Sequence, residues 1–285
     1  MEKICCDNLQ VREVLPDVVL RPYIRKYYLF ENEKGMTHFS FHPLPNGFVE
    51  IFLLLDGHRI LLHQDHKKVW TTGIISGVME LEQALKIQVE IAGTHFSGIW
   101  ILLTPLGVNR LLRSSLKTLT NRTLDLKDHW PQGARWLRKH VQSNGSEVSR
   151  IHNLDHYFML QLKEAPVCSQ RLVPVLEEME RISAYLSVSK LAQKIGVSYK
   201  WLYRKFVDDL GMTPKAYLRI IRFDRACFML DRYRDINETD IAHQCGYYDQ
   251  AHFIHEFKKI MKISPHEYVR KRKERFYYHR AYAIP

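Results

Sequence analysis

Residues 196–226 read GVSYKWLYRKFVDDLGMTPKAYLRIIRFDRA, and residues 240–270 read DIAHQCGYYDQAHFIHEFKKIMKISPHEYVR. The two segments belong to copies of one pattern. In the first part of the pattern the copies are offset by fifty positions, and in the second part by fifty-one. The matched residues are Ala192 and Ala242, Gly196 and Gly246, Phe206 and Phe257, Pro214 and Pro265, and Tyr217 and Tyr268. The second copy therefore has one extra residue in its turn.

Each copy predicts two helices joined by a tight turn. The first helix ends in the pattern apolar-Ala-x-x-apolar-Gly, where alanine lets two helices approach closely and glycine can adopt the left-handed conformation that stops a helix. The second helix carries an apolar pair at i and i+4, Leu202 with Phe206 and Phe253 with Phe257. This is the pattern of a helix-turn-helix. A plain helical bundle is the alternative for one copy, and the second copy argues against it.

The remaining C-terminal sequence also predicts helices. The expected segments are Leu176 to Ile182, Leu191 to Ile195, Trp201 to Phe206, Tyr217 to Leu230, Ile241 to Cys245, Phe253 to Ile260 and Pro265 to Arg275. A helix from Pro214 to about Asp231 has roughly 18 residues and spans about 27 Å. Such a rod allows the second helices of the two copies to lie about 34 to 36 Å apart, one turn of duplex DNA.

Charge points to the same region of the chain. The 42 Lys plus Arg exceed the 31 Asp plus Glu, which gives a net charge of +11. Residues 169–285 hold 22 basic and 14 acidic residues, a difference of +8, and residues 1–168 hold 20 and 17, a difference of +3. The excess predicts a polyanion as the partner of the C-terminal part.

The quoted segments resemble the DNA-binding domain of AraC/XylS-type transcription regulators over about residues 172–272. Three motifs carry the resemblance: Gly-x-Thr-Pro-x-x-Tyr at Gly211 to Tyr217, Arg-x-x-x-Ala at Arg222 to Ala226, and Ile-Ala-x-x-x-Gly-Tyr at Ile241 to Tyr247. The resemblance implies seven helices, of which two read double-stranded DNA and a long one joins the two units. It also allows for RNA polymerase as a partner.

The first reading helix has a defined outer face. With Leu202 and Phe206 turned inward, the exposed residues are Tyr199, Lys200, Tyr203 and Arg204. The resemblance implies base contacts at Lys200, Tyr203 and Arg204, and an arginine can pair with two acceptors of guanine. The alternative for Arg204 is a contact to phosphate or to solvent. Lys190 and Lys194 are expected to contribute equally to the affinity for all duplexes, whatever their sequence. Ser198 is expected to cap the N-terminus of the helix.

The second reading helix departs from the family pattern. Its expected face is Gln250, Ala251, Ile254 and His255, with His252 beside it and Asp249 as the cap. The family often has basic or amide side chains where Ala251 and His255 stand, which predicts weak base reading. Gln250 can pair with adenine, and His255 can donate to a phosphate or a base. The tail from Arg270 to Arg275 is either a solvated end or a contact to the DNA backbone.

The first half of the chain predicts strands. Residues 47–63 form two apolar runs around Asp56-Gly57, which favours a hairpin with a type I′ turn. Alternation predicts a third strand at Leu85 to Ile91, and a fourth is expected at His95 to Leu103. Helices are expected after Pro105 and from Asp128 to Val141.

Residues 18–130 resemble the N-terminal domain of many AraC-type proteins. The matching pieces are Leu20 to Ile24, Pro45 to Glu50 and Leu119 to Trp130. The resemblance implies a strand-rich, cupin-like barrel with flanking helices, a homodimer and a small-molecule effector. We therefore expect two domains, α+β followed by all-α. The expected bounds are 1–165 for sensing and dimerisation, 166–174 for a linker and 175–285 for the double helix-turn-helix domain.

Other sites are weaker candidates. His38, His42, His63, His66 and His95 raise the question of a barrel metal, and His252 with His255 offers only two ligands, so we expect neither metal nor cofactor. Trp70, Phe96 and Trp100 either line a pocket or belong to the core.

The sequence indicates no enzyme. No nucleophile, carboxylate pair or phosphate loop stands out, and Cys5 and Cys6 are adjacent instead of spaced as in a zinc-binding repair methyltransferase. The five cysteines and the start of the chain favour the cytoplasm over secretion or a membrane. Two alternatives stay open: a nucleoid-type protein that coats DNA through charge, and a metal-dependent barrel enzyme fused to DNA-binding helices.

Overall fold

The structure is a computed structural model in which two compact units are distinguished. The first unit comprises residues 1–43, 48–78 and 86–168, and the second comprises 44–47, 79–85 and 169–285. The residues that the structure describes are 3–6, 9–32, 38–41, 45–80, 83, 86–93, 95–141, 146–164, 172–182, 187–233 and 237–271. No helix of these residues is long and apolar enough to cross a membrane.

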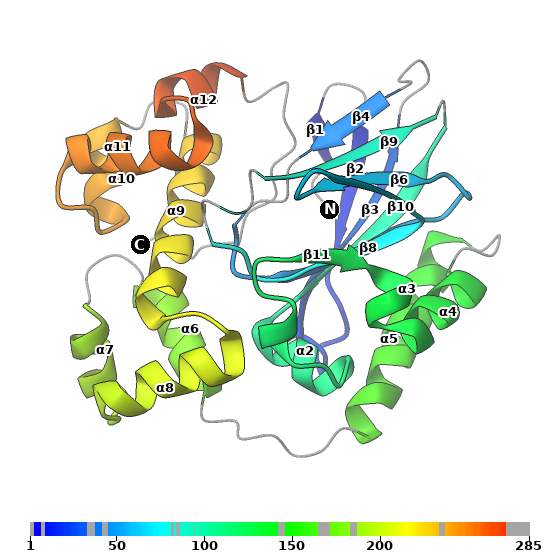
Figure 1. Ribbon diagram of the computed structural model, residues 1–285, viewed down its shortest axis with the longest axis horizontal. Helices are drawn as coiled ribbons and strands as arrows, with labels where there is room; N and C mark the ends of the chain where they lie inside the picture. Colours follow the sequence, from blue (N-terminus) through cyan, green and yellow to red (C-terminus); the bar gives the residue numbers. More distant parts are fainter. Residues whose placement is uncertain are drawn as a thin grey trace. The chain divides into compact units, whose positions relative to one another are not determined.

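The first unit is built on two antiparallel sheets (Figure 1). The larger has the order β1 (Lys3–Cys6), β2 (Leu9–Val14), β3 (Ile24–Asn32), β10 (Ser97–Leu103), β5 (Val49–Leu54), β8 (Gly73–Ser76) and β11 (Thr123–Asp125). The smaller has the order β4 (His38–Phe41), β9 (Ile87–Ala92), β6 (Ile60–Gln64) and β7 (Lys67–Thr71). The strand-rich core is thus confirmed. The cupin-like barrel is not, because no pairing among the described strands joins the two sheets.

One face of the larger sheet is aromatic. Trp100 lies opposite Phe52 in the register of β10 and β5, and their rings meet edge to face at 5.3 Å. Phe52 also stacks on Phe30 of β3 at 4.7 Å. Trp100 and Phe96 are buried, whereas Trp70 on β7 is exposed. Core packing is therefore the correct interpretation of Phe96 and Trp100.

The predicted hairpin around Asp56-Gly57 is wrong. Both apolar runs are strands, but β5 pairs with β8 and β10 while β6 pairs with β7 and β9. Gly57 has a positive φ of 83°, and Asp56 is not among the residues with positive φ, so a type I′ turn is not formed. The Asp56 carboxylate instead accepts hydrogen bonds from the backbone N–H groups of His58 and Ser97. The chain uses this corner to pass from one sheet to the other.

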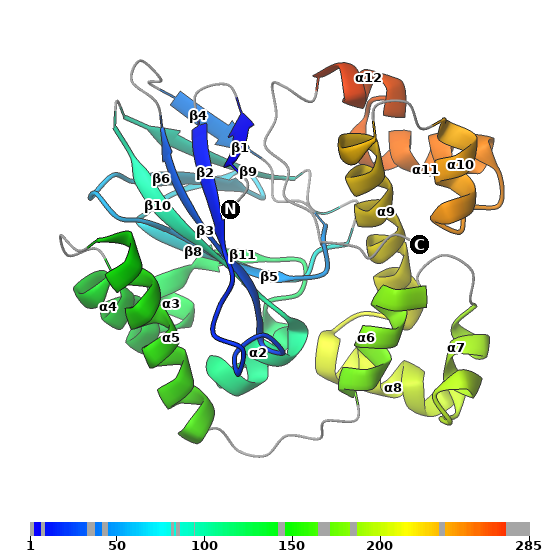
Figure 2. The ribbon, with the colours of Figure 1, turned by 180° about the vertical axis from the view of Figure 1, so that it is seen from behind.

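Helices cover the other face of the larger sheet (Figure 2). They are α2 (Pro105–Leu111), the short 3₁₀ helix η1 (Leu116–Thr118), α3 (Leu126–His129), α4 (Pro131–His140) and α5 (Glu147–Glu164). The single helix predicted from Asp128 to Val141 is wrong, because the extended φ of Trp130 and the following Pro131 divide it into α3 and α4.

Helix α5 is fixed to the sheet by a polar contact. The buried Tyr27 hydroxyl of β3 donates to Asp155 Oδ1 at 2.9 Å, and the Asp17 backbone N–H donates to Asp155 Oδ2 at 3.2 Å. Burial of the carboxyl group raises the pKa of Asp155. On α4 and α5, Trp136 stacks on Tyr157 at 4.2 Å. Helix α5 therefore packs on the sheet, and α4 packs on α5.

The second unit is entirely helical in its described main segments. Its helices are α6 (Val173–Ile182), α7 (Val188–Lys194), α8 (Tyr199–Leu210), α9 (Pro214–Arg232), α10 (Glu238–Gln244), α11 (Gln250–Met261) and α12 (Pro265–Lys271). These seven match the number that the resemblance implies. In both ribbon views α6, α7 and α8 gather at one end of α9, and α10, α11 and α12 gather at the other (Figures 1 and 2).

Candidate nucleic-acid interface

The turn between α7 and α8 is set by backbone hydrogen bonds. Gly196 has φ of 72° and donates its N–H to Gln193 at 3.1 Å, and the N–H of Val197 donates to Ala192 at 2.9 Å. The Ser198 hydroxyl accepts from the N–H of Trp201 at 3.1 Å and caps α8. The predicted glycine stop and serine cap are both present.

The turn between α10 and α11 repeats this geometry. Gly246 has φ of 73°, and the N–H of Tyr247 donates to Ala242 at 2.9 Å. The Asp249 carboxylate accepts from the N–H of His252 at 2.7 Å and caps α11. The sequence repeat is therefore a repeat of backbone structure.

Aromatic packing repeats as well. Phe206 of α8 meets Tyr217 of α9 edge to face at 5.7 Å, and Phe257 of α11 meets Tyr268 of α12 edge to face at 5.4 Å. All four side chains are fully buried, as are Leu202 and Phe253. The inward faces of both second helices are those that the sequence predicts.

Replacing Gly196 with alanine is expected to destabilise the second unit by about 1 to 2 kcal/mol. A Cβ atom at this position would meet nothing within 4 Å, so the cost comes from the left-handed backbone and not from a clash. Chemical denaturation of the full chain measures the change, with Gly196→Asn as the control because asparagine tolerates this conformation better. Equal losses for alanine and asparagine would contradict the backbone explanation.

The outer face of α8 carries free cations between two tyrosines. Tyr199 is 50% exposed and Tyr203 is 43% exposed, and their rings stack at 6.3 Å. Lys200 and Arg204 are exposed, and neither side chain has a hydrogen-bond or ion-pair partner among the described residues. The neighbouring Lys205, in contrast, pairs with Asp209 at 2.9 Å. Lys200 and Arg204 are therefore available to an anionic partner.

The start of α11 is differently arranged. The Gln250 side chain accepts from the Thr239 hydroxyl at 3.0 Å and donates to Glu238 Oε2 at 3.2 Å. Both ends of the amide are thus occupied by α10, which the sequence did not indicate. To pair with adenine, Gln250 must use the second N–H and the second lone pair that these bonds leave, or replace the bonds.

His252 is held in one tautomer by its neighbour. The N–H of Tyr248 donates to His252 Nδ1 at 3.2 Å, and a neutral imidazole that accepts at Nδ1 carries its proton at Nε2. The ring packs edge to face on Tyr247 at 5.6 Å. His252 therefore offers a donor from an exposed position at the start of α11.

Three further residues complete this end of α11. Ala251 and His255 are exposed, and Ile254 is half-buried. Tyr248, which sequence reasoning missed, is 87% exposed directly before the Asp249 cap. Its position before a capping residue was the available signal.

An ion pair holds α11 against the long helix. Arg219 of α9 donates through Nε and Nη2 to Glu256 Oε2 at 3.1 and 3.0 Å. On the same helix, burial lowers the pKa of Arg222. These contacts and the aromatic cluster fix the position of α11 on α9.

Cys227 and Cys245 are free and buried, which disfavours the thiolate form that a nucleophile needs. Burial raises the pKa of the Cys245 thiol to about 12 and raises that of Cys227 well above its ordinary value. The Cys245 thiol donates to the Met229 sulfur at 3.6 Å. Both side chains are therefore protonated at neutral pH. The side chains of Cys5 and Cys6, and Cys168 as a whole, lie outside the described residues.

The metal candidates do not converge in the part of the chain that the structure describes. There, no group of three or more His, Cys, Asp or Glu side chains lies close enough to hold an ion. His63 contacts Glu90 at 3.3 Å. His42, the side chain of His38, and residues 272–275 of the basic tail lie outside the described residues.

Comparisons with known proteins bear on each unit separately. Residues 191–271 match a family model described as a helix-turn-helix domain, and residues 12–125 match one described as a domain of unknown function (DUF6597). The transcriptional activator RhaS of Citrobacter koseri is 35% identical over 77 residues, 27% of each protein, and RhaS of Enterobacter sp. is 34% identical over 82 residues, 29% of each. The chain therefore matches less than a third of the length of these relatives.

Among solved structures, ToxT from Vibrio cholerae with bound unsaturated fatty acid is 14% identical. The superposition covers 94% of this chain and 96% of ToxT, with a TM-score of 0.46.

Proposed function

Residues 191–271 belong to the AraC/XylS type of helix-turn-helix domain, and from this premise we propose that the chain is a sequence-specific transcription regulator that binds double-stranded DNA. One observation carries the proposal. Two helix-turn-helix units with the same glycine stop, a side-chain cap of the same geometry and the same aromatic packing lie at opposite ends of α9. Such a repeat suits a ligand that itself repeats, as the major groove of DNA does.

In the proposed complex α8 and α11 enter successive major grooves. Helix α9 has 19 residues and is about 28 Å long at 1.5 Å per residue. With the width of the flanking helices, this length accommodates the pitch of about 34 to 36 Å. The free N–H groups at the starts of α8 and α11, next to Ser198 and Asp249, face phosphates.

The two reading helices have unequal roles. Arg204 pairs with guanine, Lys200 and Tyr203 contact neighbouring bases, and Tyr199 packs beside them. On α11, His252 donates through Nε2, His255 contacts a base or a phosphate, and Ala251 leaves room for the backbone to approach. Gln250 positions the start of α11 through Thr239 and Glu238. The helix-turn-helix formed by α7 and α8 therefore supplies most of the sequence preference.

The proposal extends to the first unit through the family resemblance. In this view residues 1–165 sense an effector and form a homodimer, residues 166–174 are a linker, and residues 175–285 bind DNA in the cytoplasm. RNA polymerase is then the second protein partner. Effector sensing and DNA binding do not require the chain to catalyse a reaction, which is consistent with relatives named as transcriptional activators.

Selection of bound duplexes from a random pool by the full chain tests the proposal. The expected result is an enriched site with a conserved segment for α8 and a weaker one about 10 base pairs away. Enrichment without any preferred sequence would instead identify the charge-driven coating of DNA by a nucleoid-type protein. No retention of duplexes at low salt would refute both.

Replacing Lys190 with alanine is expected to weaken the binding of selected and unrelated duplexes by the same factor. Lys190 is exposed on α7 and has no side-chain partner among the described residues, so it is free to contact phosphate. The slope of log affinity against log salt should fall by about 1. Lys194→Ala serves as the comparison, and its effect should be smaller because Lys194 pairs with Glu178 at 2.6 Å. A loss confined to the selected duplex would contradict a phosphate contact.

A further inference from the structure

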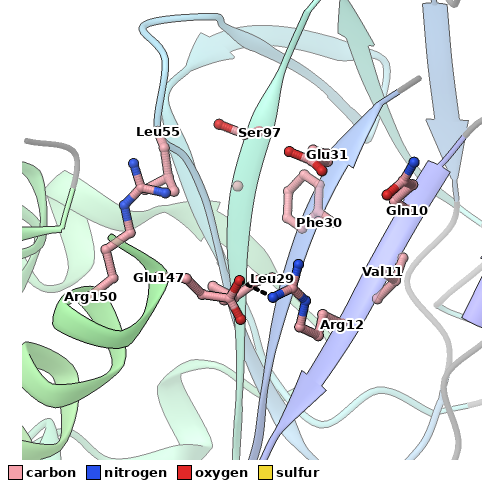
Figure 3. A pocket seen from close by; sticks show the side chains of 11 residues that line it. Gln10, Val11, Arg12, Leu29, Phe30, Glu31, Leu55, Ser97, Glu147 and Arg150 are labelled. Carbon is pink, nitrogen blue, oxygen red and sulfur yellow. Dashed lines mark ion pairs between the residues drawn. The ribbon is translucent and has the colours of Figure 1, made fainter. Parts of the chain in front are cut away.

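A pocket of about 80 Å³ lies in the first unit, on the helix-covered face of the larger sheet. Strands β2, β3 and β10 form its floor, and the first turn of α5 forms one side (Figure 3). The lining combines two arginines and two glutamates with apolar side chains. The pocket thus has both the apolar wall and the few polar groups that are typical of small-molecule sites.

The two arginines of the pocket differ in their partners. Arg12 of β2 forms an ion pair with Glu147 at the start of α5, as the dashed line in Figure 3 shows. Arg150 lies one turn further along α5, and its guanidinium extends toward Leu55 and Ser97. The buried Nε atom of Arg150 has no hydrogen-bond partner among the described residues. A buried donor without a partner is costly, so an acceptor that reaches it gains binding energy.

Ser97 supplies a second polar group from the start of β10. Its N–H donates to the Asp56 carboxylate, and its carbonyl accepts from the N–H of Leu55 at 2.8 Å. These bonds fix the backbone of Ser97, while its hydroxyl has no partner among the described residues. The hydroxyl can donate to the same acceptor that the Arg150 guanidinium binds.

The size and charge of the pocket limit the ligand. The apolar wall on this face is formed by the half-buried Leu29 and the buried Leu55. A cavity of about 150 Å³ holds the six carbon atoms of benzene, so about 80 Å³ encloses about three or four non-hydrogen atoms of a short ligand, and any further atom lies at the open side of the pocket. Glu147 neutralises Arg12, and Arg150 and Glu31 add one charge of each sign, so the formal charges of the lining sum to zero. A monoanion on Arg150 leaves a net charge of −1 and a phosphate dianion leaves −2, so the pocket favours the smaller anionic charge.

We propose that this pocket binds a short-chain monocarboxylate, with the carboxylate on Arg150 and Ser97 and the alkyl chain against Leu29 and Leu55. Arginine pairs with carboxylates through two parallel hydrogen bonds, which suits the Arg150 guanidinium because none of its side-chain atoms has a hydrogen-bond or ion-pair partner among the described residues. The ligand would join the first turn of α5 to β10. The site depends only on the first unit, so its test is separate from that of DNA binding.

Calorimetric titration of the full chain with propionate tests the proposal, with chloride held at the same ionic strength. Saturable binding of propionate is expected, and the isosteric neutral propionamide should bind at least about tenfold more weakly because it lacks the charge. Arg150→Gln should weaken propionate binding at least about tenfold. The control is Arg135→Gln, which removes an exposed arginine of α4 and should leave the affinity unchanged.

Three outcomes would overturn the site. They are the absence of saturable binding up to about 10 mM propionate, equal affinities for propionate and propionamide, and an Arg150→Gln protein that is folded by circular dichroism and binds as before. Should Arg150→Gln fail to fold, Ser97→Ala provides the second variant, with an expected loss of about threefold or more because one neutral hydrogen bond is removed. An unchanged affinity in Ser97→Ala would then contradict the assigned position of the carboxylate.

Discussion

Replacing Arg204 with alanine is expected to lower the affinity for the selected duplex by about 5- to 150-fold, with little change for unrelated duplexes. The range corresponds to about 1 to 3 kcal/mol, which is the discrimination of one bidentate contact to a base. Arg204 is exposed on α8 and has no partner among the described residues, so no internal bond offsets the loss. Binding measured on both duplexes at one salt concentration gives the ratio.

Lys205→Ala is the matched control for this experiment. Lys205 follows Arg204 directly on α8, but it is half-buried and its ammonium pairs with Asp209 at 2.9 Å. Its removal should change both affinities only slightly. Equal losses on the selected and unrelated duplexes in Arg204→Ala would assign Arg204 to phosphate, and the base-reading role would then be refuted.

The sequence predicts the second unit well because its signals are local. Glycine at positions 196 and 246 and the caps Ser198 and Asp249 determine where helices stop and start within a few residues. Because the sequence repeats, a glycine or cap predicted in one copy is supported by the matching residue in the other. The sequence does not reveal side-chain pairing across the turn, such as that of Gln250 with Thr239 and Glu238. The same residues could adopt several rotamers with different partners.

The fold of the first unit is harder to predict from sequence because its paired strands are distant from one another along the chain. The strand β10 pairs with β3, about seventy residues earlier, and with β5, about fifty residues earlier, and no local pattern specifies either neighbour. Strands β1 to β4, β7, β8 and β11 were not predicted. The hairpin at Asp56-Gly57 failed for the same reason, since turn propensity was overridden by pairing to strands elsewhere. The pocket beside Arg150 arises from such non-local pairing and could not be predicted.

Replacing Phe257 with alanine is expected to destabilise the second unit by about 3 to 5 kcal/mol. Phe257 is fully buried, and its ring meets Phe253, Phe223 and Tyr268 at 5.7, 5.6 and 5.4 Å. The single ring thus joins α11 to both α9 and α12. A loss of this size is a large share of the about 5 to 15 kcal/mol that stabilises a typical domain.

Native-state hydrogen exchange on the full chain locates this effect. The amides of α10, α11 and α12 should lose protection, whereas those of the first unit should not, because the ring partners described for Phe257 all belong to the second unit. Binding to the selected duplex should fall with the folded fraction of α11, even though Phe257 touches no DNA in the proposed complex. Tyr248→Ala is the control: it removes an aromatic ring that is 87% exposed, so the free energy of unfolding should change by less than about 0.5 kcal/mol. A Phe257→Ala protein with full protection of α11 would show that the Arg219–Glu256 ion pair, at 3.0 Å, holds this helix without the aromatic cluster.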